Sequence, residues 1–440
     1  MKITFMGAGS SIFVKNVLGD SMMCDSLKDA EFALYDIDGE RLEESRQIIE
    51  YLNGAIAGGK AKVTTFLGVD RRKDALRGAN FVINAIQVGG YEPCTVIDFE
   101  IPKKYGLRQT IGDTLGIGGI FRGLRTIPVM ADFARDMEEV CPDAWLLNYT
   151  NPMSILTGYM LRHTGVKTIG LCHSVQVCTE RLLQALGMEQ YLGNTVETIA
   201  GINHMAWLLA LTDKAGNDLY PEIRRRAKEK NAAEKHGDMV RYDYIDKLGY
   251  YCTESSEHNA EYNPFYIKQG REDLIEKFNI PLDEYPRRCI RNINNWNARR
   301  DAILKGEGLE HERSREYASR IMEAMVIDAP YKIGGNVINN GLIPNLPKEA
   351  CVEVPCFVDA NGITPSYVGE LPLQLAAMNA SNIYPQLLTI EAAATGKKEF
   401  VYQAAMMDPL TGAQLSTDEI VSMCDELIAA HTAAGFPVFK

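Results

Sequence analysis

The sequence lacks the features that would place it in a membrane or in the secretory route. None of its apolar runs approaches the roughly 20 residues that a membrane-spanning helix needs. Its first residues begin an apolar strand at once, without the basic, apolar and small-residue regions of a signal peptide. The ten cysteines are scattered and form no CxxC pair, which favours reduced, mostly buried thiols. We therefore expect a cytoplasmic protein with no membrane partner.

Positive charge is also in deficit. The formal net charge of −12 argues against nucleic acid or an anionic membrane as the main partner. The one strongly charged stretch, residues 221–235, reads as a helix with a solvated face. A chain of 440 residues exceeds the usual size of one hydrophobic core, so we expect two lobes.

The first part of the chain alternates short apolar strands with amphipathic helices, such as residues 41–53 and 120–140. This alternation predicts an α/β fold with a doubly wound parallel sheet, the Rossmann-like architecture of lactate and malate dehydrogenases. We place this domain at residues 1–198. Its expected strands are residues 3–6, 33–35, 62–66, 81–85, 144–147 and 167–171.

The pattern changes after about residue 198, and residues 199–440 are expected to form an α+β lobe. Residues 208–212, followed by a turn at 215–217, predict a hairpin. Further strands are expected at 333–338 and 351–358, and helices at 373–401 and 417–430.

The N-terminal strand ends in a turn that suits a dinucleotide. Gly7 and Gly9 would let backbone amides approach a pyrophosphate, although the third small position of the fingerprint holds Ile12. Asp36 ends the next strand, 27 residues after Gly9, where its carboxylate would bind the ribose diol and repel a 2′-phosphate. These features favour NAD over NADP, and a Rossmann-like fold without cofactor is the alternative. The predicted cofactor contacts are Gly7, Gly9, Ser10, Ser11, Asp36 and Gln87.

Polar side chains also follow two later strands. Asn148 and Asn151 occupy a loop before a proline, where they either shape the turn or contact a cofactor or sugar. Cys172 follows the strand at 167–171, and His204 lies 32 residues further on. A thiolate with an imidazole suits a transition metal that keeps open positions, but buried structural residues are commoner.

Eight motifs together resemble the family 4 glycoside hydrolases, and nearest its branch that cleaves α-galactosides. The resemblance covers essentially the whole chain. Its motifs are GAGSSIF, LYDID, NAIQVGGYEP, GDTLGIGG, LNYTNPM, LCHSVQ, GINHMAW and TESSEHNAEYNPFYIK.

The resemblance implies NAD- and Mn²⁺-dependent glycoside cleavage, which departs from the usual two-carboxylate mechanism. NAD would oxidise C3 of the sugar, and Mn²⁺ held by Cys172 and His204 would polarise the ketone. The C2 proton then becomes acidic, the glycosidic oxygen is eliminated, water adds at C1 and the hydride returns. The implied base is Tyr262, with Tyr266 as second choice and Asp113 beside the tyrosine.

One position departs from the family pattern. Several members carry Asp after the metal-binding cysteine, where it acts as the acid, and this chain has His173. An imidazolium can donate a proton, so His173 keeps the predicted role, with His258 as another candidate. By motif position, the predicted substrate contacts are Asn148, Asn151, Asn203 and Arg287.

The resemblance implies a small oligosaccharide substrate such as melibiose. It also implies a homodimer or homotetramer, for which the helices at 120–140 and 373–401 offer apolar faces that could equally be core. An α-galacturonidase or α-glucosidase of the same family is the nearest alternative. An NAD-dependent 2-hydroxy-acid dehydrogenase and a non-catalytic NAD sensor are the others.

Overall fold

A six-stranded parallel sheet forms the N-terminal part of the protein. The computed structural model describes residues 1–439, and its first six strands lie in the order β3-β2-β1-β4-β5-β6, all parallel. This is the strand order of a dinucleotide-binding sheet, so the predicted fold class is confirmed. The strands are β1 (Lys2–Met6), β2 (Glu31–Asp36), β3 (Lys62–Leu67), β4 (Phe81–Asn84), β5 (Trp145–Asn148) and β6 (Lys167–Gly170).

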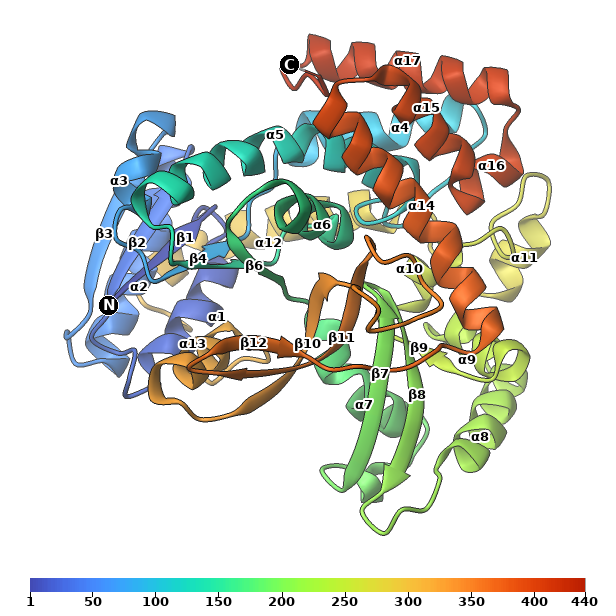
Figure 1. Cartoon of the computed structure of the whole chain (residues 1–440), viewed down its shortest axis with the longest axis horizontal. Coiled ribbons are helices and arrows are strands. Elements are labelled where there is room, and N and C mark those ends of the chain that lie inside the picture. Colours follow the sequence, from blue (N-terminus) through green and yellow to red (C-terminus); the bar gives the residue numbers. More distant parts are fainter. Residues whose placement is uncertain (440) are drawn as a thin grey trace.

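Both faces of this sheet are covered because its strands are apolar on both sides. Phe5, Leu34 and Ile83 belong to one buried cluster, whereas Tyr35 and Val82 belong to another. Figure 1 shows α5 and α6 on one side of the sheet and α1 and α2 on the other. The helices up to this point are α1 (Ser11–Met22), α2 (Gly39–Ile56), α3 (Arg72–Leu76), α4 (Val96–Lys104), α5 (Gly116–Val140), α6 (Met153–His163) and α7 (His173–Ala185), with shorter turns η1 (Val69–Arg71), η2 (Gly90–Thr95) and η3 (Glu189–Tyr191).

The strands of the second half extend the same sheet. β10 pairs antiparallel with β6 through Asn336 and Gly170, and the sheet continues through β11, β7, β8 and β9, with β12 paired to β11. β7 crosses residue 198, and the predicted domain boundary there stays a prediction. The strands are β7 (Thr195–Ile202), β8 (Met205–Asp213), β9 (Tyr251–Cys252), β10 (Tyr331–Ile338), β11 (Cys351–Asp359) and β12 (Gly362–Pro365).

The hairpin of the second half lies one strand earlier than the sequence predicted. β8 pairs with the upstream strand β7 across a turn at Asn203 and His204. His204 has a φ of +64°, the left-handed conformation of tight hairpin turns. Beyond the expected turn at 215–217, the described chain returns to β8 in the single bridge between Thr212 and Asp218.

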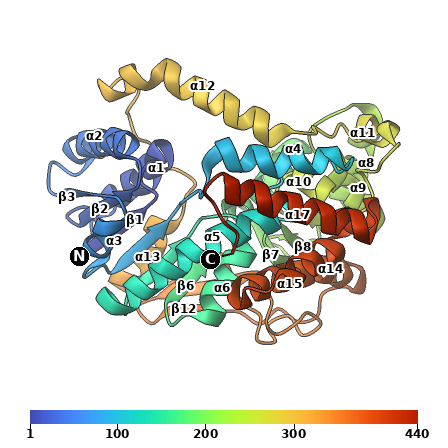
Figure 2. The same cartoon turned by 90° about the horizontal axis from the view of Figure 1, so that it is seen from above.

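The remaining helices pack around this extended sheet. The expected helix at 373–401 is two helices, because the chain turns at Gly396 with a φ of +69°. Figure 2 shows the long helix α12 crossing the outside of the molecule. The helices are α8 (Tyr220–Ala233), α9 (Met239–Leu248), α10 (Ser256–Glu261), α11 (Glu272–Lys277), α12 (Glu284–Leu304), α13 (Ala318–Ile327), α14 (Leu373–Thr395), α15 (Lys398–Met407), α16 (Pro409–Gln414) and α17 (Thr417–Ala433).

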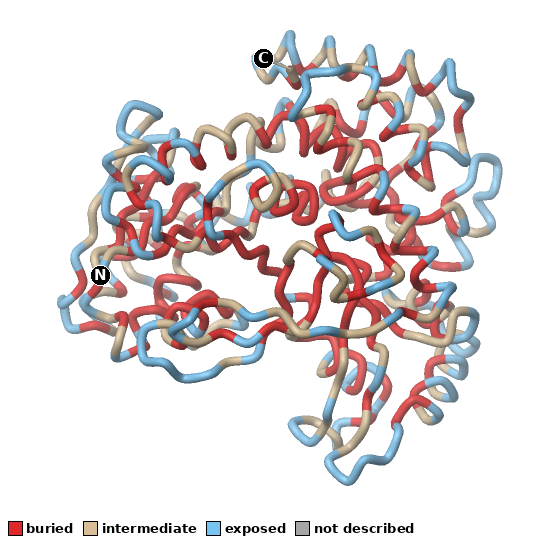
Figure 3. Tube along the Cα trace, viewed as in Figure 1, coloured by how far each residue is buried: buried red, intermediate tan, exposed pale blue. Residues whose placement is uncertain are grey.

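The apolar faces of α5 and α14, considered above as oligomer surfaces, are largely in the core. The two helices contact each other and α6, and Figure 3 shows the long buried stretches of the chain interior. Within residues 1–439, no helix combines the length and the apolarity needed to cross a bilayer.

Candidate active site

The loops that leave β1, β4, β5 and β6 meet at one edge of the sheet. They follow the carboxyl ends of parallel strands, where ligands bind in sheets of this order. Gly7 follows β1, Gln87 follows β4, Asn151 follows β5 and Cys172 follows β6. The candidate cofactor residues and the first candidate metal ligand therefore share this edge.

The β1–α1 turn requires glycine at two positions. Gly7 has a φ of +87°, and a side chain there would meet the Ala85 carbonyl oxygen at 2.8 Å. The Gly9 amide donates to Asp36 Oδ2 at 2.6 Å, and a Cβ at Gly9 would approach the same carboxylate. The amides of residues 7–10 bond Tyr35, Asp36 and Gly7. The amides left for an anion are therefore those of the first turn of α1, beside the fixed Asp36 carboxylate.

The other predicted cofactor residues differ in their exposure. Ser10 is exposed at the start of α1, and Gln87 is exposed after β4. Ser11 is buried, and its hydroxyl lies 3.0 Å from that of Ser45 on α2. Ser10 and Gln87 are free to meet a ligand at this edge, whereas Ser11 joins α1 to α2.

The buried Cys172 and His204 and the partly buried Glu254 form a cluster of groups that could hold a metal ion. One ligand atom of each lies within 4.8 Å of the other two. Cys172 begins α7, His204 occupies the β7–β8 turn, and Glu254 follows β9. The predicted pair is thus brought together, and Glu254 is an addition that sequence reasoning missed. Its signal was an acidic side chain in the segment that also holds Tyr262.

The charges in this cluster support one another. Burial lowers the pKa of His204, but the Cys172 sulfur and the Glu254 carboxylate outweigh it and raise that pKa to about 10. Burial raises the pKa of Glu254, but His204 and His258 lower it to about 2. The cluster attracts positive charge, which a divalent cation would supply.

Tyr262 lies directly against the cluster. Its phenolic oxygen is 3.2 Å from His204 Nδ1, and its side chain is fully buried. Burial raises the pKa of Tyr262 well above its ordinary value. His258 packs edge-on to the His204 ring, with 5.0 Å between the ring centroids. A phenol in this position needs nearby positive charge to act as a base.

Asp113 approaches the same group of side chains from the other half of the protein. Its Oδ1 lies 3.8 Å from His258 Nε2, and its Oδ2 accepts from the Asn151 amide at 3.4 Å. Burial opposes ionisation of Asp113, but the Arg122 guanidinium and His258 keep its pKa below the ordinary value. Asp113 is therefore a buried carboxylate whose charge acts on Tyr262, and the role that the resemblance implies for it stays a prediction.

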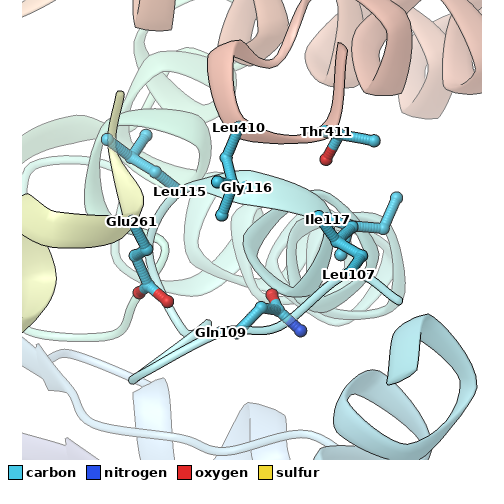
Figure 4. A pocket seen from close by; sticks show the side chains of 8 residues that line it. All are labelled: Leu107, Gln109, Leu115, Gly116, Ile117, Glu261, Leu410 and Thr411. Carbon is cyan, nitrogen blue, oxygen red and sulfur yellow. The ribbon is translucent and has the colours of Figure 1, made fainter. Parts of the chain in front are cut away.

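Glu261 holds the Asp113 loop in place. Its carboxylate accepts backbone amides from Thr110 at 2.7 Å, Ile111 at 3.2 Å and Gly112 at 2.8 Å. Figure 4 shows Glu261 reaching from α10 toward the segment that includes Gln109 and Leu115. Because Glu261 precedes Tyr262, this contact fixes the predicted base and Asp113 relative to each other.

A chain of buried hydrogen bonds links the two strands that precede the candidate metal ligands. Asn336 Nδ2 donates to the Gly170 carbonyl at 3.2 Å and to Glu353 Oε1 at 2.9 Å. The same Glu353 oxygen accepts from Asn203 Nδ2 at 3.3 Å. Gly170 is two residues from Cys172, and Asn203 precedes His204, so this chain joins the two ligand positions. The buried Asn203 is thereby occupied on its amide nitrogen.

Three residues predicted for the site form hydrogen bonds with partners outside the Cys172–His204–Glu254 cluster. Tyr266 donates its hydroxyl to Asp243 at 3.0 Å. Arg287 lies on α12, is half exposed and bonds the Leu282 carbonyl. Asn148 is fully buried, and its amide bonds Asn84, Thr150 and Thr157. Of these, Asn148 shapes the loop that carries Asn151.

His173 lies at the rim of the cluster. Its side chain is half exposed, and its Nδ1 is 4.0 Å from Glu316 Oε1. Burial of the ring lowers the pKa of His173, with Glu254 opposing that shift.

Two family models match the chain. The model described as family 4 glycosyl hydrolase matches residues 2–188, and that of the family 4 glycosyl hydrolase C-terminal domain matches residues 199–411. The chain is 63% identical to an alpha-galactosidase of Bacillus subtilis over 98% of both chains. It is 35% identical to an alpha-galactosidase of Rhizobium meliloti, covering 98% of this chain and 88% of the relative. An alpha-galacturonidase of Thermoanaerobacter italicus is 28% identical over 93% of this chain and 92% of its own.

Solved structures share this architecture. The lplD protein of Bacillus subtilis has a TM-score of 0.86 at 26% identity, covering 97% of this chain and 99% of that one. A 6-phospho-beta glucosidase of Thermotoga maritima, solved with manganese, NAD+ and glucose-6-phosphate, has a TM-score of 0.79 at 20% identity over the full length of both chains. A malate dehydrogenase of Cryptosporidium parvum has a TM-score of 0.52 at 14% identity, covering 90% of this chain and 99% of that one. The last two show a shared fold.

Proposed function

The chain belongs to the family 4 glycosyl hydrolases, and from that membership we propose that it is an α-galactosidase that depends on NAD and Mn²⁺. The observation that carries the proposal is the buried cluster of Cys172, His204 and Glu254 with Tyr262 against it. The 63% identity to the Bacillus subtilis alpha-galactosidase supports the choice of sugar.

The residues present fit both groups that this chemistry needs. Gly7 and Gly9 keep the first turn free of side chains, and Asp36 is fixed for a ribose diol, which suits NAD. Cys172 and His204 are donors that a transition metal accepts. When bound, NAD supplies a hydride acceptor for C3 of the sugar, and Mn²⁺ supplies a Lewis acid for the neighbouring oxygens.

The side chains of this protein then handle the protons. Tyr262 removes the proton from C2, which is acidic only while C3 is a ketone. His173 gives a proton to the departing glycosidic oxygen, and Asp113 with His258 orders the polar groups beside Tyr262. Asn151 and Asn203 are proposed sugar contacts, each with an amide oxygen that is buried and has no partner among the described side chains.

Arg287 and Asn148 are proposed to contribute less directly to substrate binding. Arg287 contacts its own helix and the Leu282 carbonyl, so a sugar contact would require it to turn. Asn148 acts through the loop that it anchors.

The cysteines support the proposed location of the protein in the cell. All ten are free, so the cytoplasm, where thiols stay reduced, suits a protein with a cysteine metal ligand. We propose a small α-galactoside as substrate and a homodimer or homotetramer as the assembly.

The test is a panel of α-galactosides, α-glucosides and α-galacturonides assayed with NAD, Mn²⁺ and a thiol reductant. We expect galactose release from the α-galactoside without accumulation of NADH, because the hydride returns to the sugar. NADH accumulation with a 2-hydroxy acid would replace this proposal by a dehydrogenase. Preference for a galacturonide or glucoside would keep the mechanism and change the sugar.

A further inference from the structure

Glu254, the third member of the cluster, is not one of the two metal ligands predicted from the sequence. Glu254 lies in a loop after β9, with its side chain 19% exposed. Its two oxygens face imidazole nitrogens at 3.5 Å (His204 Nε2) and 3.7 Å (His258 Nδ1). Both distances are longer than a hydrogen bond. A carboxylate that is mostly covered by protein usually accepts close donors, so the spacing points to an ion between these groups.

We propose that Glu254 is a third protein ligand of the metal ion, which makes the centre a Cys172–His204–Glu254 site. The inference deepens the proposed function and rests on it. The site would hold one divalent cation through Sγ, Nε2 and a carboxylate oxygen, and it would leave the remaining positions to substrate oxygens or water.

The distances agree with that assignment. Nitrogen and oxygen donors bind a metal of this class at about 2.1 Å, so two neighbouring donors lie roughly 3.0–3.5 Å apart. The 3.5 Å between His204 Nε2 and Glu254 Oε2 falls at the end of that range. The Cys172 sulfur also lies within the 4.8 Å that encloses the three ligand atoms, and thiolate bonds are longer.

The backbone supplies an independent observation. His204 and Glu254 both have a φ of +64°, a conformation that is uncommon for residues other than glycine. Such conformations persist where the surroundings impose them, and they concentrate at ligand sites. The β7–β8 turn accounts for the φ of His204, whereas Glu254 adopts this conformation in a loop after β9, facing His204 across the cluster.

The donor set also suits the metal better with Glu254 than without it. Manganese prefers hard oxygen donors, whereas thiolate and imidazole favour softer metals. A thiolate and a carboxylate together carry two negative charges, which a divalent cation neutralises. Tyr262 remains on the other side of the His204 ring, at Nδ1. His204, bound to the metal through Nε2, would then donate its Nδ1 proton to the Tyr262 oxygen. Histidine ligands commonly donate their second ring N–H to an acceptor outside the metal's ligand shell.

The test compares Mn²⁺ binding by the full-length wild-type protein, the Glu254→Gln variant and a control, Glu316→Gln. Binding is followed by the loss of the free Mn²⁺ electron paramagnetic resonance signal, in the presence of NAD and a reductant. Removal of an outer partner of a metal ligand already costs about 10- to 100-fold in affinity, so we expect at least that loss for Glu254→Gln. Glu316 contacts His173 from outside the cluster, and its variant should bind Mn²⁺ as the wild type does.

Co²⁺ substitution gives a second readout that does not depend on turnover. In Glu254→Gln the charge-transfer band of the Cys172 thiolate should remain, while the d–d bands change because one oxygen ligand is lost. Equal Mn²⁺ affinity with an unchanged Co²⁺ spectrum would overturn the assignment and leave the proposed function standing. A wild-type protein that binds no Mn²⁺ would overturn both. If Glu254→Gln does not fold, Glu254→Asp keeps the charge on a shorter side chain, and an affinity equal to the wild type would overturn the assignment.

Discussion

The phenolic oxygen of Tyr262 lies 3.2 Å from Nδ1 of His204, so the proposed base and a proposed metal ligand share one hydrogen bond. The His204 imidazole therefore lies between the proposed metal site and the proposed base, Tyr262. Positive charge bound on the far side of the ring would favour the phenolate, in opposition to the burial that raises the pKa of Tyr262.

We first predict that Tyr262→Phe abolishes most turnover while NAD and Mn²⁺ still bind. A positioned base contributes about 10²- to 10⁴-fold, and we expect kcat to fall within that range. Steady-state hydrolysis and binding isotherms for both cofactors check this. The matched control is Tyr266→Phe, which removes a hydroxyl bonded to Asp243 and should leave kcat near the wild-type value. Loss of activity in the control alone would move the base to Tyr266.

Deuterium at C2 of the galactoside should slow turnover or exchange into water, because Tyr262 removes that proton in the proposed mechanism. A label at C2 that is fully retained in galactose, without any rate effect, would contradict removal of the proton. A substrate deuterated at C5 is the control, since that position takes no part in the chemistry.

The choice between NAD and NADP should depend on Asp36. Its carboxylate is held by the Gly9 amide at 2.6 Å and would repel a 2′-phosphate. We expect Asp36→Ala to reduce the preference for NAD over NADP by at least about tenfold, which is about 1.4 kcal/mol. Fluorescence titration with the two reduced cofactors measures it. Asp29 is exposed, and Asp29→Ala is the control, which should leave the preference unchanged. An unchanged preference in Asp36→Ala would show that Asp36 does not contact the cofactor.

Stability should depend on a buried ionic group that joins α4, α5 and α17. Asp98 on α4 accepts a hydrogen bond from Arg125 Nη1 on α5 at 3.1 Å and lies 2.9 Å from His431 Nε2 on α17, and all three side chains are buried. Asp98→Asn leaves the Arg125 guanidinium without its counter-ion, and we expect a loss of about 3–5 kcal/mol in the free energy of unfolding. Urea denaturation tests this. Asp425→Asn removes an exposed partner of Lys398 and should cost no more than about 1 kcal/mol.

Asp408 should make the protein less stable as pH rises from about 4 to about 6. Burial raises its pKa from 3.8 to about 6, against the opposing hydrogen bonds from Thr411. The folded state therefore resists ionisation that the unfolded chain undergoes from about pH 4, and stability present at low pH is lost as pH passes through 6. Asp408→Asn keeps an acceptor for the Thr411 amide and removes the charge. We expect the variant to gain up to about 3 kcal/mol above pH 6 and little at pH 4, measured by thermal unfolding across pH. A gain that is equal at both pH values would contradict ionisation as the cause.

The parallel sheet could be predicted because each of its strands is a short apolar run between amphipathic helices. The expected strand at 62–66 begins where β3 begins, for example, and that at 167–171 differs from β6 by one residue. The β7–β8 hairpin was misplaced because a turn with Gly216 is an obvious sequence signal, whereas a turn made by Asn203 and His204 is not. Local chemistry in the sequence did not show which strand would pair.

Some residues of the candidate site could also be predicted from the sequence, and others could not. Cys172 and His204 were found because each follows a strand or turn within a recognisable motif. Glu254 was missed, since only the folded chain brings it to 3.5 Å from His204. Arg122 and Glu261 were also missed, because a buried charge within a helix looks like any other charge until its partners are known.

The hydrogen bonds from Gly170 through Asn336 and Glu353 to Asn203 have a consequence for cation selectivity. They connect the strand end before the Cys172 sulfur to the turn that carries the His204 imidazole, through side chains in the interior of the sheet. We therefore expect a change at residue 353, about 150 positions along the chain from His204, to alter the distance between these two groups. A smaller or larger metal could be favoured by altering that carboxylate, with every ligand left as it is.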